Sequence, residues 1–430
     1  MARYELAGRY WSIARGDAGT SLTTTSGKRD EPGRSTTRRY ASAAAAEAQL
    51  DAMVLDKLRA GYRPVDVVAA PRDADAAALE TRIVEHPADD AAYAVYGDWL
   101  QRQGDPRGEL IALQLAREAE VARGVTRSKL AAAIGKLVER QASVLLGDLA
   151  ALVPDVRELS AAPLIWRRGF IHRVVLDSRA GELGAIVGQI LAHPSGRFVR
   201  ELALQCDDLD DAHRVVDVLC ERVPPALADL ELLVRGQLLD LGALWPAVAG
   251  LRRISVTARG FDLGAVRLPR AERARFVTTR LSSVDLRAIA AAPWPALQRL
   301  ELRFAGRSEP NGATLADLQR LLERSDLPAL THLKLRGCEH AGEALTTLAR
   351  APLGRQLVVI DLSHGLVEAI DLRALAHYKA SFPRLRELWI PSSVVPEAKR
   401  LVDGIATHLL SDARAGQDTF PDDMAPPAAR

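Results

Sequence analysis

The sequence predicts a multidomain α/β protein, with a small α+β domain, a helical domain and then a parallel sheet with outer helices. Three observations predict this fold class. A leucine pattern with the period of one strand plus one helix fills the C-terminal half, the N-terminal residues alternate as short strands do, and the middle has helical apolar spacing. A chain of 430 residues is also too long for one core.

The leucine pattern is Leu-x-x-Leu-x-Leu-x-x-(Asn/Cys), and it is clearest from Leu330 to Cys338. Further copies of its first six positions begin at Ile171, Val199, Leu227, Leu251, Leu297, Leu357 and Leu385. The starts lie roughly 24 to 33 residues apart, with one gap about twice as long, which is the period of leucine-rich repeats. The pattern predicts a solenoid of parallel strands over residues 160–410, and it leaves the repeat count between 255 and 297 open.

Residues 1–65 have the alternation of short strands followed by one helix. Strand-forming residues gather in four segments, at Tyr4–Leu6, Tyr10–Ile13, Leu22–Thr25 and Thr36–Tyr40. Ser42 is a suitable N-cap for the alanine-rich helix that follows, and Gly61 lies near the expected end of that helix. These features predict a small α+β domain.

Residues 73–150 are predicted to be helical. One helical face is formed by positions with i, i+3, i+4, i+7 and i+8 spacing, namely Ala92, Val95, Tyr96, Trp99 and Leu100. Gly104 can end this helix, with Asp105 as the N-cap and Pro106 as the first residue of the next. A linker is expected before this region.

The acidic residues of this helical region allow two interpretations. Asp98, Asp105 and Glu109 could form a site for a hard cation, since carboxylates are the ligands such cations prefer. Alternatively, Asp90 and Asp105 cap helices and Asp98 pairs with Arg107. The second interpretation is favoured because capping, typically worth ~1 kcal/mol, is a sufficient reason for these residues.

The N-terminal segment resembles the WGR domain, a small DNA-binding module also found in poly(ADP-ribose) polymerases. The residues that carry the resemblance are Tyr4–Leu6, Tyr10, Trp11, Ile13, Thr23, Thr24, Gly27, Lys28, Gly33, Arg34, Thr36–Tyr40 and the helix after Ser42. The naming motif Trp-Gly-Arg stands here as Ser26-Gly27-Lys28. The resemblance implies phosphate contacts from a basic cluster, whose members are Lys28, Arg29, Arg34, Arg38 and Arg39. The alternative is a solvated hairpin.

Residues 75–116 resemble the short helical repeat-companion domain that precedes leucine-rich repeats in large bacterial protein families. The motif comprises His86–Asp90, Tyr96–Leu100, Gly104–Glu109 and Leu113–Gln114. The stretch Trp166–Ile171 resembles the first strand of the attached repeats. This resemblance implies the domain order 1–65, 73–150 and 160–410, and it implies no established activity.

Composition predicts a soluble cytoplasmic protein with no membrane partner. The net charge is +2, no apolar run approaches the length of a membrane span, and no signal peptide is recognisable. The cysteines Cys206, Cys220 and Cys338 are too few for a disulfide framework and are expected to be buried, inert thiols. The residues 411–430 have little to bury and are expected to be disordered.

The chain carries no recognisable catalytic motif. Its nine histidines have no metal-ligand spacing, and no phosphate-binding glycine loop follows a predicted strand. Asp361, Ser363 and His364 contain the residue types of a hydrolase triad, but neighbours in a strand point to opposite faces. Cys338 with His340 is an equally weak nucleophile pair. We therefore expect no catalytic residue, no cofactor, no bound metal and no small-molecule substrate.

The expected function is binding. Positions between the leucines should face outward on the concave side of the solenoid, and the candidate contact residues there are Arg200, Glu201, Glu231, Arg253, Arg299, Glu301, His332, Lys334, Asp361, Arg386 and Trp389. Their mixed charge favours a protein partner. Trp389 could be an aromatic anchor for that partner, and the alternative is that it packs against the C-terminal cap helix. The predicted function is a non-enzymatic bacterial adaptor, and the alternative is a DNA-binding protein that uses residues 1–65.

Overall fold

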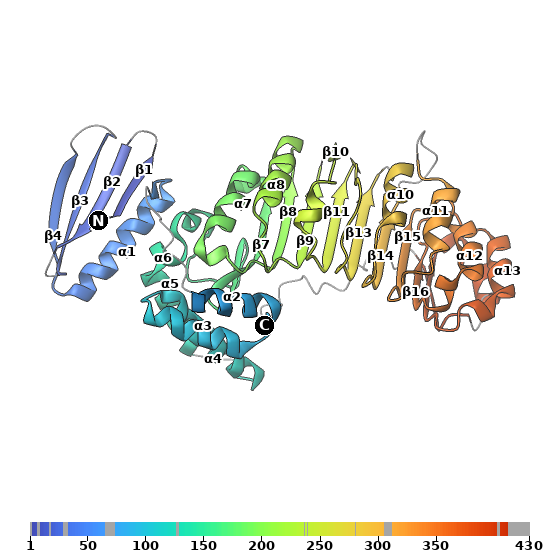
Figure 1. Cartoon of the computed structure of the whole chain (residues 1–430), viewed down its shortest axis with the longest axis horizontal. Helices are drawn as coiled ribbons and strands as arrows, with labels where there is room; N and C mark the ends of the chain where they lie inside the picture. Colours follow the sequence, from blue (N-terminus) through green and yellow to red (C-terminus); the bar gives the residue numbers. More distant parts are fainter. Residues whose placement is uncertain are drawn as a thin grey trace. The chain divides into compact units, whose positions relative to one another are not determined.

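The computed structural model describes residues 2–6, 9–16, 19–28, 33–64, 74–125, 129–235, 237–238, 240–279, 281–304, 312–401 and 405–411. The chain forms two compact units (Figure 1). The first comprises residues 1–175, 189–199 and 224–226, and the second comprises 176–188, 200–223 and 227–430.

The first unit begins with a five-stranded antiparallel sheet in the order β4-β3-β2-β1-β5. Its strands are β1 (Ala2–Leu6), β2 (Arg9–Arg15), β3 (Ser21–Lys28), β4 (Arg34–Arg39) and β5 (Arg63–Pro64). Helix α1 (Ala43–Arg59) begins after Ser42, whose side chain accepts a hydrogen bond from the amide of Ala45 as predicted. Trp11 and Leu22 are buried on one sheet face together with apolar residues of α1.

Helices follow within the same unit. They are α2 (Ala74–Glu85), α3 (Asp90–Arg102), α4 (Pro106–Ala122), α5 (Lys129–Arg140) and the short α6 (Ala142–Leu145). Asp105 caps α4 and Pro106 is its first residue, as predicted. The predicted apolar face of α3 is wrong at Val95, which is 51% exposed. The buried face is rotated toward Tyr93, since Ala92, Tyr93, Tyr96 and Leu100 are all buried.

An aromatic cluster forms the core of this helical part. Tyr96 stacks on Trp99 with ring centroids 5.8 Å apart and on Phe170 at 6.0 Å, and Phe198 meets Phe170 edge-on at 4.7 Å. Phe170 comes from the antiparallel hairpin of β6 (Leu164–Arg167) and β7 (Phe170–Asp177). Segments far apart in the sequence therefore share one core.

The second unit is built on parallel strands that lie side by side in chain order. They are β8 (Glu201–Cys206), β9 (Asp229–Val234), β11 (Arg253–Ala258), β13 (Arg273–Thr278), β14 (Arg299–Arg303), β15 (His332–Arg336), β16 (Val359–Asp361), β17 (Glu387–Ile390) and β18 (His408–Ser411). The short β10 (Gln237–Leu238) and β12 (Gly260–Phe261) pair separately.

Between β11 and β13 the described residues form no helix, whereas helices connect most of the other strands. These helices are α7 (Leu183–Ala192), α8 (Leu209–Glu221), α9 (Leu244–Ala247), α10 (Ser283–Ala291), α11 (Leu315–Leu322), α12 (Ala341–Arg350), α13 (Ala369–His377) and α14 (Val395–Leu401). Strand register aligns the pattern leucines in rows, for example Leu300 beside Leu333 and Leu302 beside Leu335. All four are at most 1% exposed, so the prediction that these leucines point inward is confirmed.

The long gap in the leucine pattern contains a strand that the pattern does not show. Strand β13 pairs with β11 on one side and β14 on the other. Ala274, Phe276 and Thr278 occupy its inward positions, so the leucine signature is missing there. The predicted tail lies outside the described part of the chain, apart from Ser411 at the end of β18.

Candidate macromolecule-binding face

The side chains that the parallel strands place between the buried leucine rows form a second face, which we call the arginine face. Alternate residues of a strand point to opposite sides of a sheet, so these positions form rows of their own. Strand register gives the first row as Asp229, Arg253, Arg273, Arg299, His332, Val359 and Glu387, and the second as Glu231, Ser255, Arg275, Glu301, Lys334, Asp361 and Trp389.

Basic residues dominate the four central strands of this face. Strands β11, β13, β14 and β15 contribute Arg253, Arg273, Arg275, Arg299, Arg303, Lys334 and Arg336. Glu301 is the acid that these four strands place there, whereas the flanking strands contribute Asp229, Glu231, Asp361 and Glu387. Positive charge is therefore concentrated on the four central strands. From the sequence we had expected basic and acidic residues to be mixed along this face.

Two buried carboxylates hold arginines in place on this face. Glu301 is 3% exposed and lies 3.6 Å from Arg275 and 4.0 Å from Arg336. Asp361 is fully buried and accepts a hydrogen bond from Arg336 at 2.8 Å. Glu301 and Asp361 were expected to face outward, but both carboxylates are buried and pair with neighbouring arginines.

The imidazole of His332 is neutral in this environment. Burial, and to a smaller extent the positive charges of Arg299 and Lys334, lower the pKa of His332 to about 4. Its Nδ1 lies 2.8 Å from the hydroxyl of Thr331. Burial is the main cause of this shift, and the cationic neighbours on β14 and β15 act in the same direction.

Trp389 is 7% exposed and is not the exposed anchor expected from the sequence. Its ring packs against Val359, and Leu410 of strand β18 pairs beside it. Its indole nitrogen lies 3.3 Å from Glu387. The physical reason is the added strand β18, which extends the sheet past β17 and covers the position.

The other predicted contact residues lie on or beside the arginine face. Glu201, Glu231, Arg253, Arg299 and Lys334 are half-buried strand residues of this face. Arg386 precedes β17 and is exposed. Arg200 precedes β8, and its carbonyl accepts hydrogen bonds from the amides of Ala228 and Asp229 at the start of β9.

A hollow of about 800 Å³ lies at the carboxyl ends of β9, β11, β13 and β14. It is lined by Leu233, Val234, Arg235, Thr257, Ala258, Arg259, Val277, Thr278, Thr279, Arg303, Phe304, Gly337 and His364. The sequence interpretation missed this site. The signal that could have revealed it is an arginine at or just after the end of three strands, namely Arg235, Arg259 and Arg303.

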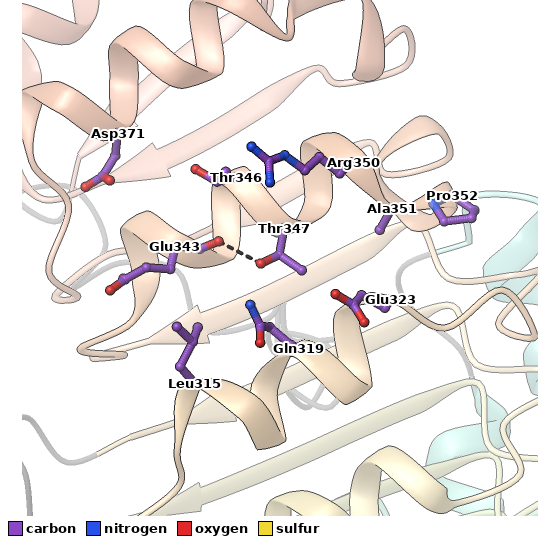
Figure 2. A pocket seen from close by; sticks show the side chains of 10 residues that line it. All are labelled: Leu315, Gln319, Glu323, Glu343, Thr346, Thr347, Arg350, Ala351, Pro352 and Asp371. Atoms are coloured by element: carbon purple, nitrogen blue, oxygen red, sulfur yellow. Dashed lines mark hydrogen bonds between the residues drawn. The ribbon is translucent and has the colours of Figure 1, made fainter.

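A second hollow of about 440 Å³ lies between α11, α12 and α13 (Figure 2). Glu323, Glu343 and Asp371 line it together with Arg350, so its charge is mixed. The hydroxyl of Thr347 donates to the Glu343 carbonyl at 2.9 Å, and Arg350 lies 5.7 Å from the Tyr378 ring centroid. Because acidic and basic side chains line it together, this hollow has no charge of a single sign and is the weaker candidate.

The basic cluster of the N-terminal sheet is split between its two faces. Strand register pairs Ser26 with Arg34 and Leu22 with Arg38, so Lys28, Arg34 and Arg38 share the face that buries Leu22. Arg39 lies on the opposite face. Arg34 and Arg38 are exposed on β4, the edge strand of the sheet. Arg29 lies outside the described residues.

The acidic residues of the helical part serve caps and ion pairs. Asp89, rather than the predicted Asp90, caps α3, and Asp90 lies 2.5 Å from Arg168. Arg107 pairs at 2.7 Å with Asp105, not with Asp98 as the sequence suggested. Within the part of the chain that the structure describes, no group of three or more His, Cys, Asp or Glu residues is arranged to hold a metal ion.

The candidate nucleophiles are in environments that disfavour reaction. Cys206 and Cys338 are buried, and burial raises the pKa of each thiol to about 12. Cys220 is partly exposed. The hydroxyl of Ser363 donates to Asp361 at 2.6 Å, so its proton is directed to a carboxylate rather than to a histidine base.

The comparisons with known proteins add little to this description of the face. No protein-family model matches the chain, and no curated protein matches it. A crystal structure of a Bacteroides fragilis protein is similar, with a TM-score of 0.46 and 13% identity over 97% of each chain. No helix of the described residues is both long enough and apolar enough for a transmembrane span.

Proposed function

We propose that this chain is a non-enzymatic adaptor whose leucine-rich-repeat solenoid recognises a protein partner on the arginine face. The observation that carries the proposal is the register that places basic side chains on four adjacent strands. Arginine is enriched at the centres of protein interfaces, where it makes both apolar and hydrogen-bonding contacts. The surface matches that composition.

The proposed binding mechanism depends on a surface that is ordered before the partner arrives. Arg275 donates to the hydroxyls of Ser255 and Thr257 at 3.2 and 3.3 Å, and Arg336 is held by Asp361. Side chains that are already fixed lose little conformational entropy on binding. A partner would therefore bind more tightly than it would to the same side chains if they were disordered before binding.

The domain organisation belongs to the same proposal. A WGR-like domain over residues 1–65 and a helical companion domain over residues 73–150 precede the solenoid of residues 160–410 in a cytoplasmic bacterial protein. The support is the order of motifs in the sequence, together with an antiparallel sheet, a helical segment and a parallel sheet in that order.

Affinity purification of the tagged full chain from its own host tests this proposal. The wild type is compared with Arg273→Glu/Arg299→Glu on the arginine face and with Arg320→Glu/Arg373→Glu on helices α11 and α13, which carries the same charge change. We expect a co-eluting protein that the first variant loses and the second retains. A co-eluting set that is identical for all three proteins would contradict the proposal.

DNA binding by the N-terminal sheet is the second candidate function. The observation that favours it is the shared sheet face of Lys28, Arg34 and Arg38, which can contact one phosphate backbone. The position of Arg34 and Arg38 on the edge strand β4 also fits protection against strand pairing with other chains, which charged edge residues provide. A binding measurement is needed to distinguish DNA contact from protection of the sheet edge.

Gel-shift titration with nicked and blunt duplex DNA at low salt separates these alternatives. Lys28→Glu/Arg34→Glu/Arg38→Glu should abolish salt-sensitive binding if the sheet contacts DNA. Arg39→Glu, on the opposite face, is the control and should reduce binding only slightly. No shift with wild-type protein at low salt would remove this candidate.

A further inference from the structure

We propose that the hollow at the carboxyl ends of β9, β11, β13 and β14 binds an acidic polypeptide segment through one apolar side chain and its flanking carboxylates. This inference rests on the proposed function and specifies the chemistry of the partner. The proposed ligand is a peptide, and the experiment below would also reveal a preference for nucleic acid.

The rim of the hollow is basic. Arg259 and Arg303 are exposed, and Arg235 is also exposed while its Nε lies 2.9 Å from Asp207. Among the described residues that line the hollow, none is acidic. Carboxylates form strong, geometrically specific pairs with arginine guanidinium groups, so the rim is suited to an acidic ligand.

The floor of the hollow is apolar. Val234, Ala258 and Val277 line it and are at most 8% exposed as residues, and the side chain of Phe304 is partly exposed beside them. The nearby hydroxyls of Thr278 and Thr279 both donate to the Arg259 carbonyl, at 2.9 and 2.8 Å. Those hydroxyl protons are therefore engaged, and the floor is suited to an aliphatic or aromatic side chain.

An apolar floor favours a peptide over a nucleic acid. Single-stranded nucleic acids bind by stacking bases on aromatic platforms, and duplexes bind mainly through phosphates. The lining contains one aromatic ring apart from the imidazole of His364, and three of its four buried residues are aliphatic, namely Val234, Ala258 and Val277 beside Thr278. Apolar cores surrounded by arginines are the composition of protein interfaces.

The spacing of the arginines predicts a short motif. Arg259 follows β11 and Arg303 ends β14, with β13 between these strands. Neighbouring strands lie about 4.8 Å apart, so the two backbones are roughly 10 Å apart at these positions. An extended peptide covers that distance in about three residues. The expected ligand therefore has two acidic residues about three positions apart with an apolar residue between them.

Selection from a phage-displayed library of random peptides tests this inference on the full chain. We expect enriched peptides to carry the acid–apolar–acid motif, and Arg259→Glu/Arg303→Glu to weaken their binding by at least ~10-fold. Arg320→Glu/Arg373→Glu, with the same charge change on the helices, should bind as wild type does. Thermal unfolding of each variant verifies that it is folded.

In the selection, the inference would be overturned by no enrichment, by enriched peptides without an acidic excess, or by equal binding of the Arg259→Glu/Arg303→Glu variant. Single-stranded or duplex DNA that binds more tightly than the peptides and depends on the same arginines would also overturn it. Retention of the co-eluting protein by Arg259→Glu/Arg303→Glu, with loss by Arg273→Glu/Arg299→Glu, would contradict this inference and leave the proposed function intact.

Discussion

Asp51 is a buried carboxylate on α1 whose charge has little compensation. The hydroxyl of Ser143 lies 3.3 Å from its Oδ1, whereas Oδ2 has no hydrogen-bond partner among the described residues. Burial is the main cause that raises the pKa of Asp51 to about 6, and the charge of Glu47 adds to the effect. The ionised form is therefore disfavoured in the folded state.

Asp51→Asn should stabilise the protein at neutral pH. The folded pKa of about 6 exceeds the unfolded value of about 3.9, so the stability gained from protonation is present below pH ~4 and is lost as pH rises through 6. The variant should gain on the order of 1–2 kcal/mol at pH 7.5 and little at pH 4. Denaturant unfolding at several pH values measures this difference, and a pH-independent difference would contradict it.

Leu335 is fully buried in the leucine rows and tests the packing of the parallel sheet. Leu335→Asp should lower the free energy of unfolding by about 3–5 kcal/mol, because it buries a charge without a partner. Leu335→Met keeps the volume and should lower it by less than about 1.5 kcal/mol. Equal losses measured by urea unfolding would show that the position is not packed as described.

Residue-scale features differ in how far the sequence predicts them. Helix caps at Ser42 and Asp105 could be predicted, because a cap acts within three residues of its own position. Burial of Glu301, Asp361 and Trp389 could not, because residues of other strands cover these side chains. Long-range pairing decides which strand positions remain accessible.

At the scale of elements, aspartates in the first turns of several helices join neighbouring strand–helix segments. Asp211 of α8 accepts hydrogen bonds at 3.0 Å from the amides of Leu183 and Gly184, which begin α7. Asp285 of α10 accepts the amide of Leu263, and Asp317 of α11 accepts the hydroxyl of Ser283 in α10. Asp211 and Asp285 thereby satisfy amides of buried residues in the preceding segment, which would otherwise lack an acceptor.

Asp211→Asn should destabilise the second unit. The side chain of asparagine offers one neutral acceptor oxygen, so one of the two α7 amides loses its acceptor and the other keeps an uncharged one, with an expected loss of about 1–3 kcal/mol. Asp210→Asn, at the exposed neighbouring position, is the matched control and should change the stability by less than about 0.5 kcal/mol. Urea unfolding compares them, and equal effects would contradict the assigned role of Asp211.

Strand β13 shows why element counts are harder to predict than element type. Its sequence RARFVT has Ala274 and Phe276 inward, without the leucines on which the pattern depends. Its outward residues Arg273 and Arg275 complete the basic centre of the arginine face. Because the leucine pattern does not show β13, its two arginines were not counted on the face, and the charge expected from the sequence was mixed.

At the scale of the whole molecule, net charge conceals the charge distribution. The chain has a formal net charge of +2, yet β11 to β15 concentrate arginines on one face of the parallel sheet. Local potential, rather than net charge, controls the association with a charged partner. The prediction of mixed α/β structure with a parallel sheet followed from the period of the leucine pattern, whereas this charge distribution required the strand order.

Salt should slow the association of the chain with its partner. Electrostatic steering acts over about the Debye length, which is ~30 Å at 0.01 M ionic strength and ~8 Å at 0.15 M. The association rate constant should therefore fall by about 10-fold or more over this range, with a smaller change in the dissociation rate. Surface plasmon resonance with the co-purified partner measures both rates, and a salt-independent association rate would argue against a charged interface.

The most direct test of the arginine face is labelling of arginines by a dicarbonyl reagent, with and without the co-purified partner, followed by mass spectrometry. The partner should protect Arg253, Arg299 and Arg303 on the sheet and leave Arg320 and Arg373 on the helices reactive. Protection of the helix arginines with unchanged reactivity of the sheet arginines would contradict the account.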